Sequence, residues 1–152
     1  MDSPLVVDLK AVFQSHPGAC LVLRPDLSIV DASDEFLRVT LTFREDIRDR
    51  ALFTVFPDNP NEPESDGASK LNASLQRVLR SGTPDTLPVQ RYEVQDRVAE
   101  NGRWVEKYWA SANSPIFAEG KRDIICLLHS ARDVTPIVRA RRQLEEQLLL
   151  EV

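Results

Sequence analysis

The chain has 152 residues, of which 42% are hydrophobic and 28% charged, and its net charge is −5. These values are typical of one soluble globular domain, large enough to bury a core without disulfides or metals. The acidic balance argues against a domain that binds nucleic acid directly, and it gives no reason to expect a membrane partner. No apolar run approaches the ~20 residues that cross a bilayer, and no signal-peptide pattern is present. We therefore expect a cytoplasmic protein.

The first predicted element is an N-terminal helix over residues 1–15, with Asp2-Ser3-Pro4 as its cap and first-turn proline. Its apolar stripe consists of Leu5, Leu9, Val12 and Phe13. His16-Pro17-Gly18 ends the helix. The apolar segments 19–23 and 28–32 then predict a hairpin of two short strands.

A helical region follows this hairpin. Residues 33–63 favour short helical pieces, because prolines at 57, 60 and 63 cannot continue a helix. Residues 65–81 give the clearest helix, which Gly82 ends. Its apolar positions recur at i, i+4, i+7 and i+8 and are Leu71, Leu75, Val78 and Leu79.

The last third of the chain predicts strands over 87–94, 104–116 and 123–132, and then a helix over 137–152. This helix is amphipathic, with an apolar stripe of Ile137, Ala140, Leu144 and Leu148 among Arg and Glu residues. A pair and a triplet of strands around a helical insert favour one antiparallel sheet with helices on one face. The predicted class is α+β.

Few residues suggest catalysis or metal binding. Cys20 and Cys126 lie in apolar runs without zinc-ligand spacing, so we expect buried free thiols and no metal site. The motifs of phosphate loops, nucleophile elbows and zinc hydrolases do not occur, and we expect no enzyme activity. An acidic cluster interleaved with prolines lacks an EF-hand register and is interpreted as a solvated loop. Its members are Asp58, Glu62, Glu64 and Asp66.

Several segments resemble the PAS family. Asp133-Val134-Thr135 resembles the Asp-Ile/Val-Thr tripeptide with which PAS domains end. Residues 28–37 are similar to the second strand and following helix of the family, with Ser33 where Asn often stands. Residues 71–79 and 108–116 resemble a PAS subtype common in bacterial signal-transduction proteins.

The resemblance covers residues 16–135 and implies a PAS fold, a five-stranded antiparallel sheet with short helices on one face. Residues 1–15 and 136–152 would flank it as an N-terminal cap helix and a C-terminal signalling helix. Such a module relays a small-molecule or partner signal to an effector outside this chain, such as a histidine kinase or response regulator. Asp49 stands where many members have Gly, so the local turn is left open.

The resemblance also implies a pocket between the sheet and the short helices. By similarity to members that bind cofactors, the strand parities of Trp109 and His129 face it. The candidate ligand-binding residues are Trp109, Asn113, His129, Tyr92 and Ser111. A polar-aromatic or carboxylate-bearing metabolite would suit them, with anion binding that strengthens as pH falls through about 6.5. The alternative is a collapsed core in which these groups bond to one another.

Cofactor chemistry finds little support. Haem needs an axial ligand, and residues 51–82, where the family places it, contain no His, which leaves His129 alone. Flavin photochemistry in the light-sensing PAS class uses a Cys in an Asn-Cys-Arg-Phe-Leu motif, and no such motif occurs here. We expect no haem and no flavin photoadduct.

An enzyme of the ketosteroid-isomerase type is the alternative function. Such an enzyme also packs helices on a curved sheet, and it needs an isolated carboxylate and a tyrosine in an apolar pocket. Glu93 or Glu106 could supply the first, and Tyr92 or Tyr108 the second.

The ends of the chain suggest assembly and signal output. Two apolar stripes exceed what one small domain needs, so we expect a parallel, two-fold homodimer through Leu5, Leu9, Val12, Phe13, Ile137, Leu144 and Leu148. Asp133 and Thr135 should fix the junction to the last helix by capping its free N–H groups, and so relay the signal.

Overall fold

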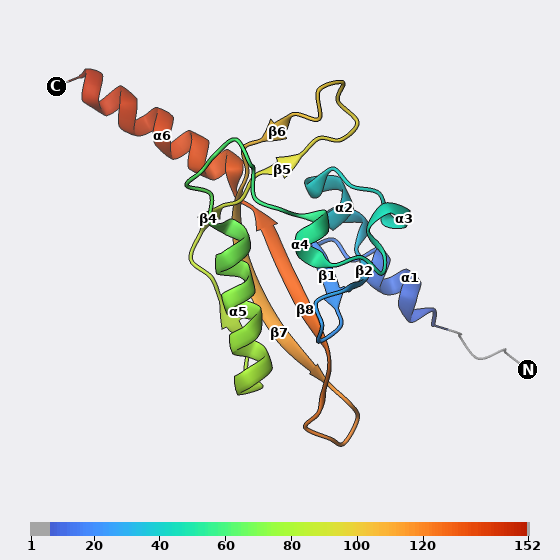
Figure 1. Cartoon of the computed structure of the whole chain (residues 1–152). Coiled ribbons are helices and arrows are strands. Elements are labelled where there is room, and N and C mark those ends of the chain that lie inside the picture. Colours follow the sequence, from blue (N-terminus) through green and yellow to red (C-terminus); the bar gives the residue numbers. More distant parts are fainter. Residues whose placement is uncertain (1–6, 152) are drawn as a thin grey trace, which may run out of the picture.

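The computed structural model describes residues 7–151, which form a main antiparallel sheet with helices packed on one of its faces and a separate two-stranded sheet (Figure 1). The helices are α1 (Leu9–Gln14), α2 (Asp34–Thr40), α3 (Arg44–Ile47), α4 (Leu52–Val55), α5 (Gly67–Ser81) and α6 (Thr135–Leu150). The strands are β1 (Cys20–Leu23), β2 (Ile29–Ala32), β3 (Asp85–Thr86), β4 (Gln90–Arg91), β5 (Val94–Gln95), β6 (Trp104–Val105), β7 (Tyr108–Phe117) and β8 (Ile124–Asp133).

The sheet has the order β2-β1-β8-β7-β3, and β4 pairs with β7 beside β3. The expected continuous strand over 87–94 is therefore wrong, because two short strands share the fifth position. Asp85 pairs with Asn113 whereas Gln90 pairs with Trp109, so the register slips by one residue between them. Pro88 lies in the gap and has no N–H to donate to a ladder. The slip reverses which alternate residues face the helices.

The expected strand over 104–116 is also interrupted. Its first two residues, β6, pair with β5 in a separate two-stranded sheet. The main strand β7 begins at Tyr108, after the chain has bent back to the sheet. The β5–β6 hairpin consequently stands apart from the main sheet in Figure 1.

Local sequence accounts for the helices that cover the sheet. Helix α5 buries Leu71, Leu75 and Val78 at helical spacing and ends at Gly82, whose φ of 67° suits glycine. Helix α2 is capped by Ser33, whose Oγ accepts from the N–H groups of Phe36 at 3.3 Å and Cys20 at 2.9 Å. Serine thus makes the capping bond to Phe36, and a second bond to the start of β1, at the position where the PAS family often has Asn.

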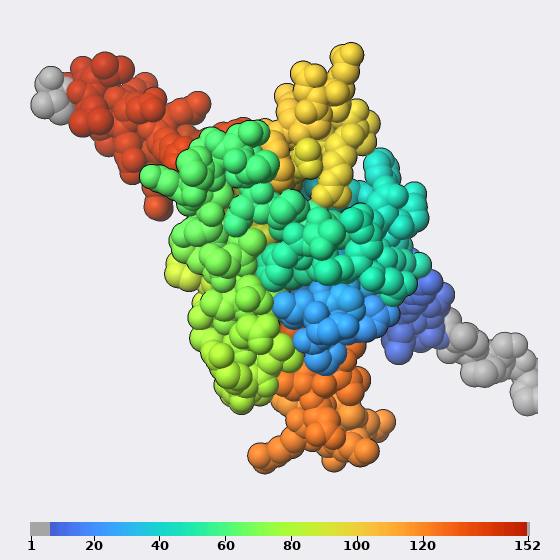
Figure 2. Space-filling model, in the orientation of Figure 1, coloured from blue at the N-terminus to red at the C-terminus, as the bar shows by residue number. Residues whose placement is uncertain are grey.

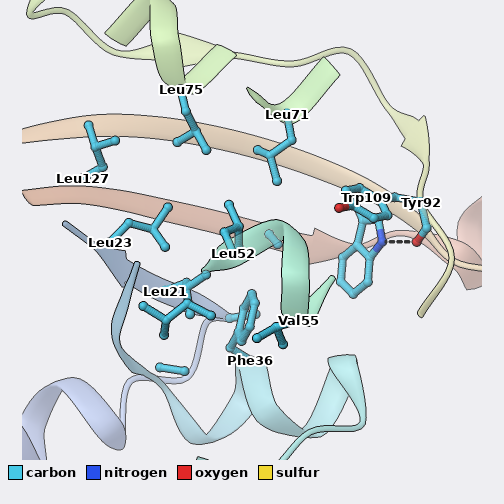
Figure 3. Packing of buried hydrophobic residues seen from close by; sticks show 14 of the residues in the cluster. Leu21, Leu23, Phe36, Leu52, Val55, Leu71, Leu75, Tyr92, Trp109 and Leu127 are labelled. Atoms are coloured by element: carbon cyan, nitrogen blue, oxygen red, sulfur yellow. Dashed lines mark hydrogen bonds between the residues drawn. The ribbon is translucent and has the colours of Figure 1, made fainter. Parts of the chain in front are cut away.

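The core lies between these helices and the sheet (Figure 3). Leucines from β1 and β8 meet leucines of α5, and α2 and α4 close the other end with aromatic and branched side chains. The labelled core residues are Leu21, Leu23, Phe36, Leu52, Val55, Leu71, Leu75, Tyr92, Trp109 and Leu127.

The two terminal helices lie on opposite sides of the domain (Figure 1). Helix α1 begins at Leu9, capped by Asp8, whose carboxylate accepts from Ala11 N–H at 3.2 Å. The expected cap at Asp2-Ser3-Pro4 and the stripe residue Leu5 lie outside the described residues. Helix α6 begins at Thr135, two residues earlier than expected, and projects from the body of the domain (Figure 2).

Candidate functional site

A cavity of about 40 Å³ lies between the sheet and the helices α2, α4 and α5. Apolar side chains form most of its wall, and a few polar groups from β4, β7 and β8 complete it. The lining residues are Phe36, Thr40, Leu52, Phe56, Leu71, Gln90, Tyr92, Val94, Trp109, Ser111, His129 and Ala131. This volume has room for one or two water molecules and is well below the ~150 Å³ that admits benzene.

All five sequence-predicted site residues are buried, but they do not share one role. Trp109, Ser111 and His129 line the cavity, as their strand parities indicate, and Tyr92, whose parity the sequence leaves open, lines it too. Asn113 does not line it; this residue is fully buried and pairs with His129 across β7 and β8. It acts on the cavity only through its bond to His129.

A chain of hydrogen bonds connects His129 to the edge of the sheet. Nδ1 of His129 lies 2.7 Å from Oδ1 of Asn113, and Nδ2 of Asn113 donates to Oγ of Ser74 at 2.8 Å. Ser74 in turn donates to Oδ2 of Asp85 at 2.6 Å, and Arg77 donates to the same oxygen at 2.9 Å. Bonds to Arg77 and Ser74 lower the pKa of Asp85, which keeps it ionised.

The ionised Asp85 carboxylate determines which group donates in each of these hydrogen bonds. A carboxylate only accepts, so the Ser74 hydroxyl proton is committed to Asp85 and its oxygen must accept from Asn113. The Asn113 amide therefore presents its oxygen to His129, and Nδ1 of His129 must carry a proton. Within residues 7–151, the His129 ring makes a hydrogen bond only through Nδ1, and Nε2 is not one of the fully buried atoms without a partner.

Burial lowers the pKa of His129 from 6.5 to about 4. The ring is consequently neutral at physiological pH, with Nε2 as a bare acceptor. The free ring therefore takes up its proton near pH 4 and not near the expected 6.5, and the binding of an anion stays a prediction.

Trp109 and Tyr92 hold each other in place. Nε1 of Trp109 donates to the Tyr92 carbonyl oxygen at 2.8 Å (Figure 3), and the Tyr92 hydroxyl donates to the carbonyl oxygen of Phe56. Burial raises the pKa of Tyr92 well above its usual value. These bonds agree with the collapsed-core alternative for these two residues, since their polar atoms already have partners.

Gln90 is the cavity residue that sequence reasoning missed. It is 8% exposed, lines the cavity, and has a buried carboxamide oxygen without a hydrogen-bond partner in residues 7–151. Gln90 lies two residues before Tyr92 and shares its face, so the two-residue alternation of a strand could have identified it. The slip between β3 and β4 obscured it, because the parity of this segment cannot be assigned without the slip.

The junction between β8 and α6 is tightly bonded. Oδ1 of Asp133 accepts from Thr135 N–H at 3.0 Å, and Lys107 donates to Oδ2 at 2.7 Å. Partial burial raises the pKa of Asp133, but the bonds to Lys107 and Thr135 outweigh it and the pKa is lowered. The Thr135 hydroxyl accepts from Tyr108 N–H at 2.9 Å, so Thr135 binds β7 and does not cap α6 as expected.

The cavity does not fit the cofactors and the enzyme considered above. It is far too small for haem or flavin, and neither cysteine lines it. Within residues 7–151 no carboxylate lines it either, as an isomerase of the ketosteroid type would need. Glu93 faces the acidic loop beside Asn59, and Tyr108 lies at the α6 junction beside Arg142.

The acidic loop borders a second hollow of about 240 Å³, which Asp58, Glu62, Glu64 and Asp66 line together with Arg91. Among residues 7–151 no group of three His, Cys, Asp or Glu side chains could hold a metal ion. Over the same range, no helix is both long and apolar enough to cross a membrane.

Comparisons with known proteins identify the fold. No family model and no curated protein matches the chain. Among solved structures, an RNA-binding light-oxygen-voltage receptor matches with a TM-score of 0.64 and 19% identity over 94% of this chain and 36% of its own. The PAS domain of a Colwellia psychrerythraea protein gives 0.62 and 15% over 84% and 95%.

A third match is the PAS domain of the fruit-fly ELK potassium channel, with a TM-score of 0.58 and 17% identity over 84% of this chain and 94% of that one. The chain spans 36% of the light-oxygen-voltage receptor and 65% of a second light-oxygen-voltage protein, so it corresponds to part of each. The chain has the α+β PAS fold, and the resemblance of its sequence segments to this family is confirmed at the level of the fold.

Proposed function

We propose that this chain is a sensory module in which a small molecule in the cavity alters the start of α6, and α6 passes the change to an effector outside this chain. One observation carries the proposal. Strand β8 places His129 and Ala131 on the cavity wall, and α6 begins four residues after Ala131, at Thr135.

The contacts of the junction support this route. Tyr108 starts β7, the strand that carries the cavity residues Trp109 and Ser111. Its backbone bonds to Thr135 and Val134, and its hydroxyl accepts from Arg142 of α6 at 2.6 Å. A displacement of β7 or β8 at the cavity would therefore change the contacts that orient α6.

Hydrogen exchange tests this proposal. Compounds that co-purify with the protein are first identified by mass spectrometry, and exchange at the start of α6 is then compared with and without them. Binding should change this exchange in the wild type. Asp133→Ala should lose about 0.5–2 kcal/mol of helix anchoring and uncouple the response, whereas Asp123→Ala, in the exposed turn before β8, should respond like the wild type. Bound compound without any change in α6 would refute the relay.

We further propose that the module is a two-fold homodimer in which α6 pairs with its copy. Ile137, Leu144 and Leu148 are each more than half exposed in the single chain. The α1 residues Leu9 and Val12 are also exposed but lie on the opposite side of the domain, so they would form a separate contact. An effector such as a histidine kinase or response regulator would then receive two helices.

Light scattering at high micromolar concentration tests the dimer. Leu144→Lys should shift the protein towards a monomer, because it places a charge within the stripe. Glu146→Lys, on the opposite face of the same helix, should not. A wild-type protein that is strictly monomeric would exclude this assembly.

A further inference from the structure

We propose that the cavity selects a compact, uncharged ligand that donates hydrogen bonds to Nε2 of His129 and to the carboxamide oxygen of Gln90. The inference rests on the proposed sensory function and specifies the chemistry of its ligand. It replaces the carboxylate-bearing ligand that the sequence suggested.

The first argument is the lack of charge around the cavity. Within residues 7–151, no Lys, Arg, Asp or Glu lines it. A carboxylate or an ammonium group would have to leave water without a partner of opposite charge, which costs several kcal/mol or more. The wall therefore disfavours both anions and cations.

The second argument is the fixed proton on His129. The bonds from His129 through Asn113 and Ser74 end at the Asp85 carboxylate, so the Nδ1 proton points away from the cavity towards Asn113. Nε2 is left as an acceptor on a neutral ring, which suits a ligand N–H or O–H.

The third argument is the unpaired oxygen of Gln90. A buried acceptor without a partner is costly, and native proteins rarely keep one without a reason. Gln90 is 8% exposed, and its unpaired oxygen is buried; the residue belongs to the same cavity wall as His129. Two acceptors on one small wall favour a ligand with several hydrogen-bond donors. The Ser111 hydroxyl lies on the same wall.

Size limits the ligand further. A cavity of about 40 Å³ does not admit a six-membered ring without movement of its walls. The one-turn helix α4, which contributes Leu52 and has no side-chain cap, is the part of the wall with the fewest helical bonds. A ligand larger than the cavity would have to displace this part of the wall, so a compact ligand is favoured.

Three probes of similar size separate the possibilities. Pyrrole and furan are five-membered rings that differ by an N–H donor in place of an ether oxygen, and acetate is a small anion. The single N–H of pyrrole can donate to one of the two acceptors at a time. Binding is followed at pH 7 by chemical-shift changes of the His129 ring in the full chain. We expect pyrrole to bind about tenfold more tightly than furan, the worth of one hydrogen bond to a buried acceptor, and acetate not to bind.

Variants assign the effect to the cavity. Gln90→Leu should reduce pyrrole affinity, leave furan affinity equal or higher, and preserve the melting temperature, because it removes an unpaired polar atom. Gln95→Leu, on β5 outside the cavity lining, should change none of the affinities.

The outcomes distinguish the two levels of the proposal. Tighter binding of acetate, or equal binding of pyrrole and furan, would overturn the ligand class and leave a sensory cavity in place. If no probe binds and no compound co-purifies with the protein, the proposed sensory function fails together with the ligand class.

Discussion

The buried imidazole of His129 should make the stability of the domain depend on pH. The folded-state pKa is lowered to about 4, whereas the unfolded chain takes up the same proton near 6.5. Between these values the unfolded state binds more protons, so the free energy of unfolding falls as pH falls. The loss reaches about 2 kcal/mol at pH 5 and about 3 kcal/mol once the pH is below 4.

Urea unfolding followed by tryptophan fluorescence measures this loss, since Trp109 is buried beside the cavity. Between pH 7 and pH 5, the contribution of His129 to the free energy of unfolding is separated from the contributions of the carboxylates. The lowered carboxylate pKa values of Asp31, Asp85 and Asp133 act only near and below the ordinary aspartate pKa of about 4.

Two variants assign the loss to one residue. His129→Gln keeps a donor for Asn113 but cannot titrate, and its stability should be flat over this range. His16→Gln, which removes the exposed histidine, should show the same loss as the wild type. A wild-type free energy that does not change from pH 7 to 5, or a His129→Gln variant with the wild-type slope, would refute the reasoning.

Two further predictions concern packing and the direction of the hydrogen-bond chain. Gly67→Ala should destabilise the fold by about 1–3 kcal/mol, because the new Cβ would lie 2.6 Å from Cγ of Tyr92. Urea unfolding measures this loss, which should be smaller in a Tyr92→Ala background. Asp85→Asn replaces the acceptor-only end of the chain with an amide that can also donate. The ¹⁵N shifts of His129 should then report a mixture of tautomers, and an unchanged single tautomer would show that Asp85 does not set the proton position.

Local periodicity in the sequence was enough to find α5 and the inward faces of β7 and β8. Backbone geometry repeats every 3.6 residues in a helix and every two in a strand, so Leu71, Leu75 and Val78 predict one face, and Trp109 and His129 predict another. The observed α5 differs from the prediction only by two residues at its start. The burial of the expected site residues follows from the same regularity.

Pairing between distant segments decided what periodicity could not. The one-residue slip around Pro88 arises where β3 and β4 meet β7, and it alone turns Gln90 towards the cavity. The neutral charge of His129 likewise depends on its burial, and the position of its proton depends on the bond to Asn113, which lies 16 positions earlier in the chain. Register and desolvation are set by neighbours that are remote in sequence, so these features of the site could be established only from the tertiary structure.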